Sequence, residues 1–359
     1  MIFYKNNIKI LFALIFLCWS VISVGNKWII ITTINHPTKV FDTLSKLDDW
    51  HILVVADKKT PKDWQFPGVT VLTVEDQLLL NYKIMQYIPW NHYGRKNIGY
   101  LYAISCGAKL IYETDDDNYL SAGLIDLQPE YSDWVAVASD TIVTNPYAYF
   151  DQPTVWPRGY PLNSILKKDT ATWTCQKNIF IPIQQGLVDK DPDVDAIFRL
   201  TRTDEIFFNA QKMPLALDQG VMAPYNSQNT VIYYSAFWSL LMPCTVSGKV
   251  SDIWRAYISQ RLLWDIGGSL CFVGPYAFQE RNQHDLLKDF IDEMDLYTKT
   301  DQLLLLLGQA LNGDSLSERM LNLFGLLYEH SMIKQADVDL AYAWLQDLES
   351  VGYKFPALK

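Results

Sequence analysis

Short apolar runs alternate with helical segments through the first half of this chain. Runs of Val and Ile without polar alternation are typical of strands buried on both faces, and intervening helices are typical of crossovers between parallel strands. The sequence therefore predicts an α/β fold built on a parallel sheet with helices on both faces. The expected strands are Trp28–Thr33, His51–Ala56, Val69–Val74, Leu110–Glu113 and Trp134–Ser139, and the expected helices are Thr38–Leu47, Leu78–Ile88 and Asn97–Gly107.

Polar residues follow several of these strands at the end where the chain leaves the sheet. Thr33 and Asn35 follow the first strand, and Asp57 follows the second. Ligands of parallel sheets bind beyond the carboxyl ends of the strands. We therefore expect these residues to contact a nucleotide, together with Asn97 at the start of the helix before the fourth strand.

The fourth strand ends in three consecutive aspartates within KLIYETDDDN. Carboxylates at contact distance repel one another by roughly 1 kcal/mol per pair even in water, so a cation at this position would stabilise them. In an extended chain Asp115 and Asp117 point to one side and Asp116 to the other. We predict that Asp115 and Asp117 hold Mn²⁺ or Mg²⁺ with the phosphates of a nucleotide, while Asp116 contacts the ribose. The alternative is a solvated acidic turn.

The middle of the chain, Thr144–Pro243, is rich in Pro, Asn and aromatic residues and indicates long loops with short antiparallel strands. Arg158 lies in a Pro-Arg-Gly turn, where a guanidinium could clamp a diphosphate, act on a glycosyl group, or form a surface ion pair. Asp193 and Asp195 stand two residues apart before an apolar segment. They either bind sugar hydroxyls or order a turn.

Two later residues complete the candidate site. Asp252 follows Ser251, which resembles an N-cap, so Asp252 is expected at the first position of a helix. There it could act as the base that deprotonates an acceptor hydroxyl, or it could simply complement the helix dipole. His284 either completes the metal shell or is structural.

Charge and the C-terminal pattern define the rest of the organisation. The formal net charge of −10 argues against nucleic acid as a partner and against attraction to an anionic membrane. From His284 onward the chain is almost wholly helical in pattern, and its apolar helices leave room for a homo-oligomer. We predict a targeting segment at residues 1–25, a sheet domain at residues 26–283 and a helical C-terminal region at residues 284–359.

The N-terminal segment is expected to direct the chain to the secretory pathway. Lys5 and Lys9 precede the uncharged apolar run Ile10–Val24, which is short for a membrane-spanning helix and suits a signal peptide. A single N-terminal membrane anchor is the alternative. Beyond Cys18, four cysteines remain, which permit three disulfide pairings or buried free thiols.

Several long motifs resemble one family. KLIYETDDDN, NPYAYFDQPTVWPRGYPL, IQQGLVDKDPDVDAIFRL, NSQNT and SDIWRAYISQRLLWDIG look like the STELLO-type proteins of plants and nematodes, which are Golgi-directed and have a glycosyltransferase-like domain. More distantly, the order of these motifs is similar to that of the reversibly glycosylated polypeptides, which are UDP-arabinopyranose mutases.

The resemblance implies a GT-A fold, a Rossmann-like mixed sheet that binds a nucleotide-sugar, with a helical C-terminal appendage. It implies the metal and nucleotide motif at Asp115–Asp117, matches Arg158 to the mutase arginine, and places Asp252 at the position of the usual base. The function expected is a metal-dependent glycosyltransferase of the Golgi that uses a UDP-sugar and a glycan or protein acceptor. A nucleotide-sugar mutase and a non-catalytic binding or assembly protein are the alternatives.

Overall fold

The computed structural model describes residues 26–167, 171–280 and 285–359. The segment at residues 1–25, predicted to be a targeting segment, and His284 lie outside the described residues. Within the described residues no helix has the length and apolar character needed to cross a membrane.

One mixed sheet organises the molecule. Among the described residues it has eleven strands in the order β3-β2-β1-β4-β10-β8-β11-β9-β6-β7, and β5 pairs with β11. The strands are β1 (Lys27–Thr33), β2 (Trp50–Ala56), β3 (Val69–Leu72), β4 (Leu110–Thr114), β5 (Asn118–Leu120), β6 (Tyr131–Ala138), β7 (Thr172–Phe180), β8 (Ile183–Asp189), β9 (Leu215–Leu217), β10 (Asn229–Tyr233) and β11 (Leu270–Gln279).

The sheet is parallel at one side and mixed beyond it. Strands β3, β2, β1 and β4 run parallel, as expected. Beyond β4 the sheet includes the antiparallel strands expected in the middle of the chain, because β10 pairs antiparallel to both β4 and β8, and β9 pairs antiparallel to β11. Strands β8 and β11, and β6 and β9, pair in parallel. The α/β class and the mixed sheet of a GT-A-like domain are confirmed.

Helices cover the parallel strands and the central part of the sheet. The early ones are α2 (Val40–Leu44), α3 (Val74–Leu79) and α4 (Lys96–Ser105), and short 3₁₀ turns η1 (Lys83–Gln86) and η2 (Tyr93–Arg95) lead into α4. Helix α4 lies so close to the sheet that a Cβ on Gly99 would stand 2.5 Å from Val55 Cγ2. The chain leaves this helix at Gly107, whose φ of +90° suits glycine.

Two predicted helix boundaries are wrong. The helix expected at Leu78–Ile88 is instead α3 followed by η1, because a capping box between Thr73 and Asp76 starts α3 earlier and Asn81, at φ 54°, interrupts it. The helix expected to begin at Ser251 is α7 (Gly248–Asp265), whose N-cap is Ser247. Asp252 therefore lies one turn inside α7 and not at its first position.

The middle of the chain also has short helical segments. These are α5 (Pro146–Tyr149), η3 (Leu162–Ser164), α6 (Ala196–Thr201) and η4 (Tyr234–Leu240).

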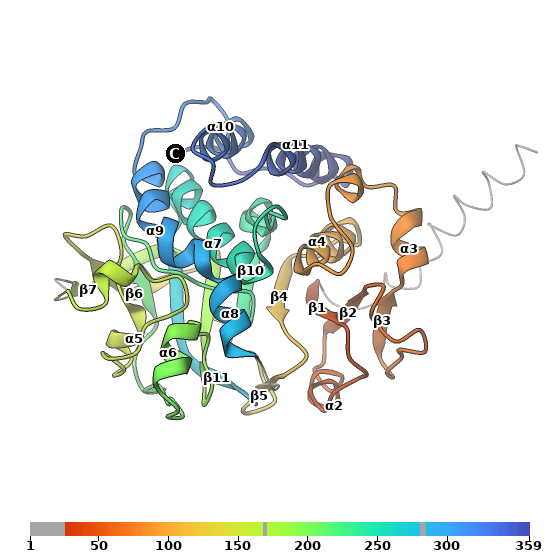
Figure 1. Cartoon of the computed structure of the whole chain (residues 1–359), viewed down its shortest axis with the longest axis horizontal. Coiled ribbons are helices and arrows are strands. Elements are labelled where there is room, and N and C mark those ends of the chain that lie inside the picture. Colours follow the sequence, from red (N-terminus) through yellow and green to blue (C-terminus); the bar gives the residue numbers. More distant parts are fainter. Residues whose placement is uncertain (1–25, 168–170, 281–284) are drawn as a thin grey trace, which may run out of the picture.

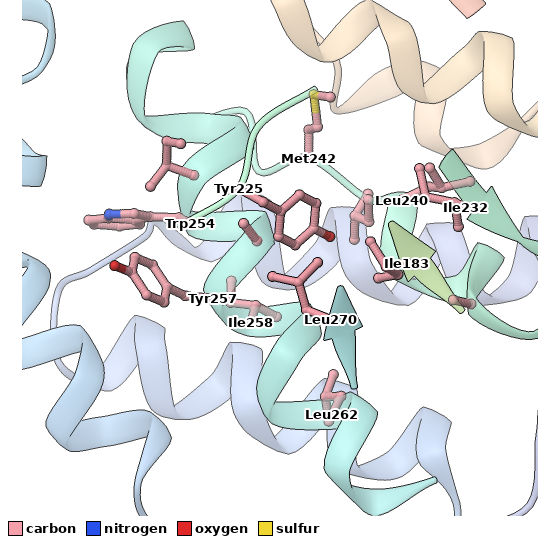
Figure 2. Packing of buried hydrophobic residues seen from close by; sticks show 14 of the residues in the cluster. Ile183, Tyr225, Ile232, Leu240, Met242, Trp254, Tyr257, Ile258, Leu262 and Leu270 are labelled. Atoms are coloured by element: carbon pink, nitrogen blue, oxygen red, sulfur yellow. The ribbon is translucent and has the colours of Figure 1, made fainter. Parts of the chain in front are cut away.

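The predicted helical C-terminus is confirmed. Its helices are α8 (Leu286–Asp292), α9 (Met294–Leu307), α10 (Leu316–Glu329) and α11 (Gln335–Ser350). Figure 1 shows α10 and α11 along one side of the molecule, with α11 reaching toward α4. These helices share one hydrophobic core with α4 and α7. Figure 2 shows the centre of that core, where Tyr225 and sheet residues such as Leu270 lie on one side of α7, and the Trp254 and Tyr257 side chains of α7 project on the other.

The four cysteines of the described chain form no disulfide. Cys244 and Cys271 are buried, Cys106 is half-buried and Cys175 is exposed on β7. Burial raises the pKa of both buried thiols, which keeps them protonated at neutral pH.

Candidate functional site

A pocket of about 540 Å³ opens at the carboxyl ends of β1, β2 and β4. Most of the site residues predicted from the sequence line this one pocket, although they come from distant parts of the chain. They are Thr33, Asn35, Asp57, Asp115, Asp116, Asp117, Arg158, Asp193 and Asp252.

Asp116 joins the ends of β1 and β4. Thr33 donates its hydroxyl hydrogen to the Asp116 carboxylate, and the Asn35 amide donates to the same oxygen at 3.1 Å. The Thr38 hydroxyl donates to the Asp116 carbonyl. The Asp116 carboxylate thus orders the turn after β1 without any ligand.

Asp115 and Asp117 are held by different neighbours. The Tyr93 hydroxyl and the Lys96 ammonium donate to Asp115 Oδ1 at 2.8 and 3.1 Å. The Gln279 amide donates to Asp117 Oδ2 at 2.9 Å, and Asn118 donates to the other Asp117 oxygen. Both carboxylates are half-buried and line the pocket.

These two carboxylates fit a divalent cation that arrives with a nucleotide. In the described part of the chain, no group of three or more His, Cys, Asp or Glu side chains is placed to hold a metal. Mg²⁺ is commonly bound by one or two carboxylates, with substrate phosphates and water completing its shell. Asp115 and Asp117 meet this requirement and would hold the ion only weakly without the diphosphate.

Arg158 is held by two aspartates. Its Nε and Nη2 donate to Asp193 at 2.7 and 2.9 Å, and its Nη1 and Nη2 donate to Asp252 at 3.2 and 3.0 Å. Nη1 also donates to the Lys249 carbonyl, so all five N–H donors of the guanidinium are used. Gly159 allows this arrangement, since its φ is +83° and a Cβ there would stand 2.3 Å from Ile253 of α7.

The cluster fixes the ionisation of its members. Burial opposes the charge of Arg158, but Asp193 and Asp252 outweigh it and raise the pKa of Arg158. Burial likewise opposes ionisation of Asp252, but Arg158 and then Arg255 outweigh it and lower the pKa of Asp252. Asp252 is therefore an ionised carboxylate at neutral pH, in the protonation state that a base requires.

A second buried ion pair connects α7 to the aspartates. Arg255, one turn after Asp252, donates to both carboxylate oxygens of Glu113, two residues before Asp115. Both side chains are at most 2% exposed, and the Tyr100 hydroxyl also donates to Glu113. Helix α7 therefore holds the Arg158 cluster and the end of β4 in one rigid frame.

Arg95 lines the pocket but was not predicted from the sequence. It is 1% exposed, it stacks at 3.7 Å on the Trp90 ring, and one nitrogen, Nη2, donates to Gln77. Its Nε and Nη1 are buried without a hydrogen-bond partner in the part of the chain that the structure describes. Burial lowers the pKa of Arg95 to about 10, so it remains charged at neutral pH. The signal in the sequence was Arg95-Lys96 at a helix start, where cations are unfavourable.

Two predicted residues lie elsewhere, and a third is not described. Asn97 is fully buried, and its amide exchanges hydrogen bonds with the backbone of Met242 at 2.9 and 3.0 Å. Asp195 caps α6 through the Phe198 N–H and accepts a hydrogen bond from Trp156, so it orders a turn. The structure does not place either of them in the pocket, and His284 lies outside the described residues.

The comparison with known proteins agrees with the resemblance noted from the motifs. The family described as STELLO glycosyltransferases matches residues 249–359. The probable glycosyltransferases STELLO1 and STELLO2 of Arabidopsis thaliana are 34% and 35% identical to this chain over 355 and 358 residues. These matches cover 92% of this chain but 45% and 46% of the relatives, so the chain spans less than half of their length. Over most of its length this chain is therefore similar to the STELLO glycosyltransferases.

Proposed function

We propose that this chain is a metal-dependent glycosyltransferase that takes its sugar from a UDP-sugar. The observation that carries the proposal is the pocket at the carboxyl ends of the parallel strands, where three consecutive aspartates meet residues following β1 and β2. This is the edge of an α/β sheet at which nucleotides bind.

The charge of the pocket supports a metal-bound donor. Its lining contains more acidic than basic side chains, and Arg158 is already neutralised by two of the acids. A bare diphosphate would be repelled by this surface. A divalent cation held by Asp115 and Asp117 would supply positive charge to the diphosphate as it leaves.

The side chains of Asp57 and Arg95 favour uracil as the base of the donor nucleotide. The uracil ring offers carbonyl acceptors beside its N3–H donor. Arg95 has two unpartnered donors for a carbonyl oxygen, and the Asp57 carboxylate can accept the N3–H. Cytosine would bring its amino group to the Arg95 donors and leave N3 without a donor, which predicts weaker binding of CDP.

In this proposal the cluster of Arg158, Asp193 and Asp252 contacts the sugar of the donor. Asp193 and Asp252 line the pocket with lone pairs available for sugar hydroxyls, and Asp252 is the base that takes the proton of the acceptor hydroxyl. A mutase that attaches the sugar to Arg158 would require a guanidinium nitrogen to lose its proton. Five hydrogen bonds and two carboxylates oppose that loss, which favours transfer over the mutase alternative.

The acceptor is a glycan or protein in the secretory pathway, reached through the targeting segment at residues 1–25 and carried to the Golgi. We expect a tagged full-length chain to colocalise with Golgi markers. Retention of the tagged chain in the cytosol would contradict this part of the proposal.

Titration calorimetry of UDP tests the donor site. We expect UDP to bind the wild-type chain in Mn²⁺ and to bind far more weakly in EDTA, because the ion offsets the acidic pocket. Asp117→Ala should abolish the Mn²⁺ effect, while Asp140→Ala, at an exposed aspartate outside the pocket, should bind UDP like the wild type.

Product analysis then separates the three candidate functions. Free UDP with a glycosylated acceptor indicates transfer, and an isomerised nucleotide-sugar indicates a mutase. Binding of UDP without turnover of any UDP-sugar indicates a non-catalytic protein. A wild-type chain that does not bind UDP in Mn²⁺ would overturn the proposal.

A further inference from the structure

Lys96 is a fully buried cation behind the aspartates. Its side chain is 0% exposed, whereas that of its ion-pair partner Asp115 is 30% exposed. The ammonium stands 3.1 Å from Asp115 Oδ1, 2.9 Å from the Thr114 carbonyl and 3.3 Å from the Ser227 carbonyl. It also contacts the Tyr93 hydroxyl at 3.0 Å. Lys96 thus joins α4, the end of β4 and the loop before β10.

This position is unfavourable for a lysine in two respects. A buried ammonium loses its hydration, and the loss is compensated only if charged and polar partners surround it. Lys96 is also the first residue of α4, at the positive end of the helix dipole. A neutral residue would avoid both costs, so the charge of Lys96 calls for an explanation in terms of the site it supports.

We infer that Lys96 is a positioning residue that holds Asp115 for the metal and gives the aspartate cluster one permanent positive charge. The inference rests on the proposed function. The ammonium and Tyr93 both contact Asp115 Oδ1, and among the described residues Oδ2 has no side-chain partner. The ion pair therefore orients the carboxylate and leaves one oxygen for a ligand.

The charge of Lys96 matters as much as the orientation. With Lys96 present, one divalent cation neutralises the three aspartates. Without Lys96 the same loaded cluster would retain a negative charge beside the diphosphate. Lys96 therefore lets a single Mn²⁺ or Mg²⁺ prepare the pocket for an anionic donor. It does not line the pocket itself, so it reaches the bound metal by orienting Asp115 and by its charge.

The test measures the Mn²⁺ concentration that half-saturates UDP binding, by calorimetry or intrinsic fluorescence. We expect Lys96→Met to raise this concentration about 10- to 100-fold, the usual effect of losing an outer partner of a metal ligand. Lys109→Met is the matched control, since Lys109 precedes β4 at its opposite end and is exposed. It should leave the Mn²⁺ requirement unchanged.

A double-mutant cycle with Asp115→Asn tests the route of the effect. Because Lys96 orients the metal ligand through Asp115, Lys96→Met should cost less in the Asp115→Asn background than in the wild type. Lys96→Gln, which keeps hydrogen-bond donors without the charge, should raise the Mn²⁺ requirement in the same way and replaces Lys96→Met if that variant does not fold.

The outcomes separate this inference from the proposed function. An unchanged Mn²⁺ requirement in a folded Lys96 variant, or independent losses from the Lys96 and Asp115 substitutions, would overturn the role of Lys96 while UDP binding by the wild type stands. A wild type that does not bind UDP in Mn²⁺ would instead overturn the proposed function, and this inference with it.

Discussion

At the scale of single residues, we expect Arg95 to contribute to UDP binding more than to the stability of the fold. Among the described residues no carboxylate forms an ion pair with Arg95 and two of its nitrogens lack hydrogen-bond partners, so only the Trp90 ring and the Gln77 side chain compensate the burial of its charge. Arg95→Met removes an unfavourable buried charge but leaves the side-chain Oε1 of Gln77 without its donor. These two effects on stability oppose each other. We expect a melting temperature near that of the wild type. UDP affinity should fall by about 1.5–3 kcal/mol, the contribution of hydrogen bonds to a charged group.

Thermal melts and UDP calorimetry on the same sample check this expectation. Arg202→Met serves as the control, because Arg202 also stacks on an aromatic ring, Phe198, but lies outside the pocket. Unchanged UDP affinity in Arg95→Met would contradict the role assigned to Arg95 at the base.

At the scale of elements, helix α11 connects the C-terminal region to the site. Its Asp337 accepts hydrogen bonds from the N–H groups of Cys244 and Thr245 at 2.6 and 3.1 Å, just before the Ser247 cap of α7. Asp347, near the other end of α11, accepts from the N–H groups of Lys83 and Ile84 in η1. The helix thus fixes loops on both sides of α4.

Removing the first of these contacts should weaken both the fold and the site. Asp337→Ala removes the acceptor of the buried Cys244 N–H and of the half-buried Thr245 N–H, and we expect a loss of about 1–3 kcal/mol in the free energy of unfolding from the buried group alone. UDP binding in Mn²⁺ should also weaken, because the loop leads into the first turn of α7. Asp339→Ala on the same helix should leave the free energy of unfolding and UDP binding unchanged. Denaturant unfolding and UDP binding assays on both variants measure these effects. Equal stability of the two variants would show that α11 does not support the site.

The elements that could be predicted from the sequence are those with an unambiguous pattern. Strands β1, β2 and β4 are continuous apolar runs, so their ends and the residues after them were placed correctly. Strand β8 and the first two residues of β10 resemble loops because Gln185, Asn229 and Thr230 are polar, yet these side chains are buried and hydrogen-bonded to one another or to backbone. Only the assembled sheet supplies those partners.

The predicted start of α7 is wrong for a related reason. Ser251-Asp252 fits a helix start as well as Ser247 does, and the choice between them depends on contacts with distant residues. Ser251 is fully buried and its hydroxyl donates to the Pro243 carbonyl, while Asp252 faces Arg158. The joining of Arg158, Asp193 and Asp252 from three segments could not be derived from their spacing.

At the scale of the whole molecule, several acids are buried away from the pocket. Burial raises the pKa of Asp195, Glu293, Asp337 and Asp347 above the ordinary range. A carboxyl group whose pKa is higher in the folded than in the unfolded chain destabilises the fold above its folded pKa, and this penalty disappears as the pH falls through that value. His92 acts in the opposite direction, because burial lowers its pKa.

Glu293→Gln isolates one of these acids. Glu293 is 1% exposed and accepts hydrogen bonds from the Ala196 N–H and the Tyr297 hydroxyl through a single oxygen, which the glutamine carbonyl can replace. The variant should therefore melt at a higher temperature than the wild type at about pH 7.5, well above the ordinary pKa of a glutamate in the unfolded chain. The difference should shrink toward zero as the pH approaches the ordinary glutamate pKa of about 4.3. Because His92 is present in both proteins, its titration cancels from the comparison. Melting curves measured across this range would contradict the argument if the variant were less stable at neutral pH or if the difference did not vary with pH.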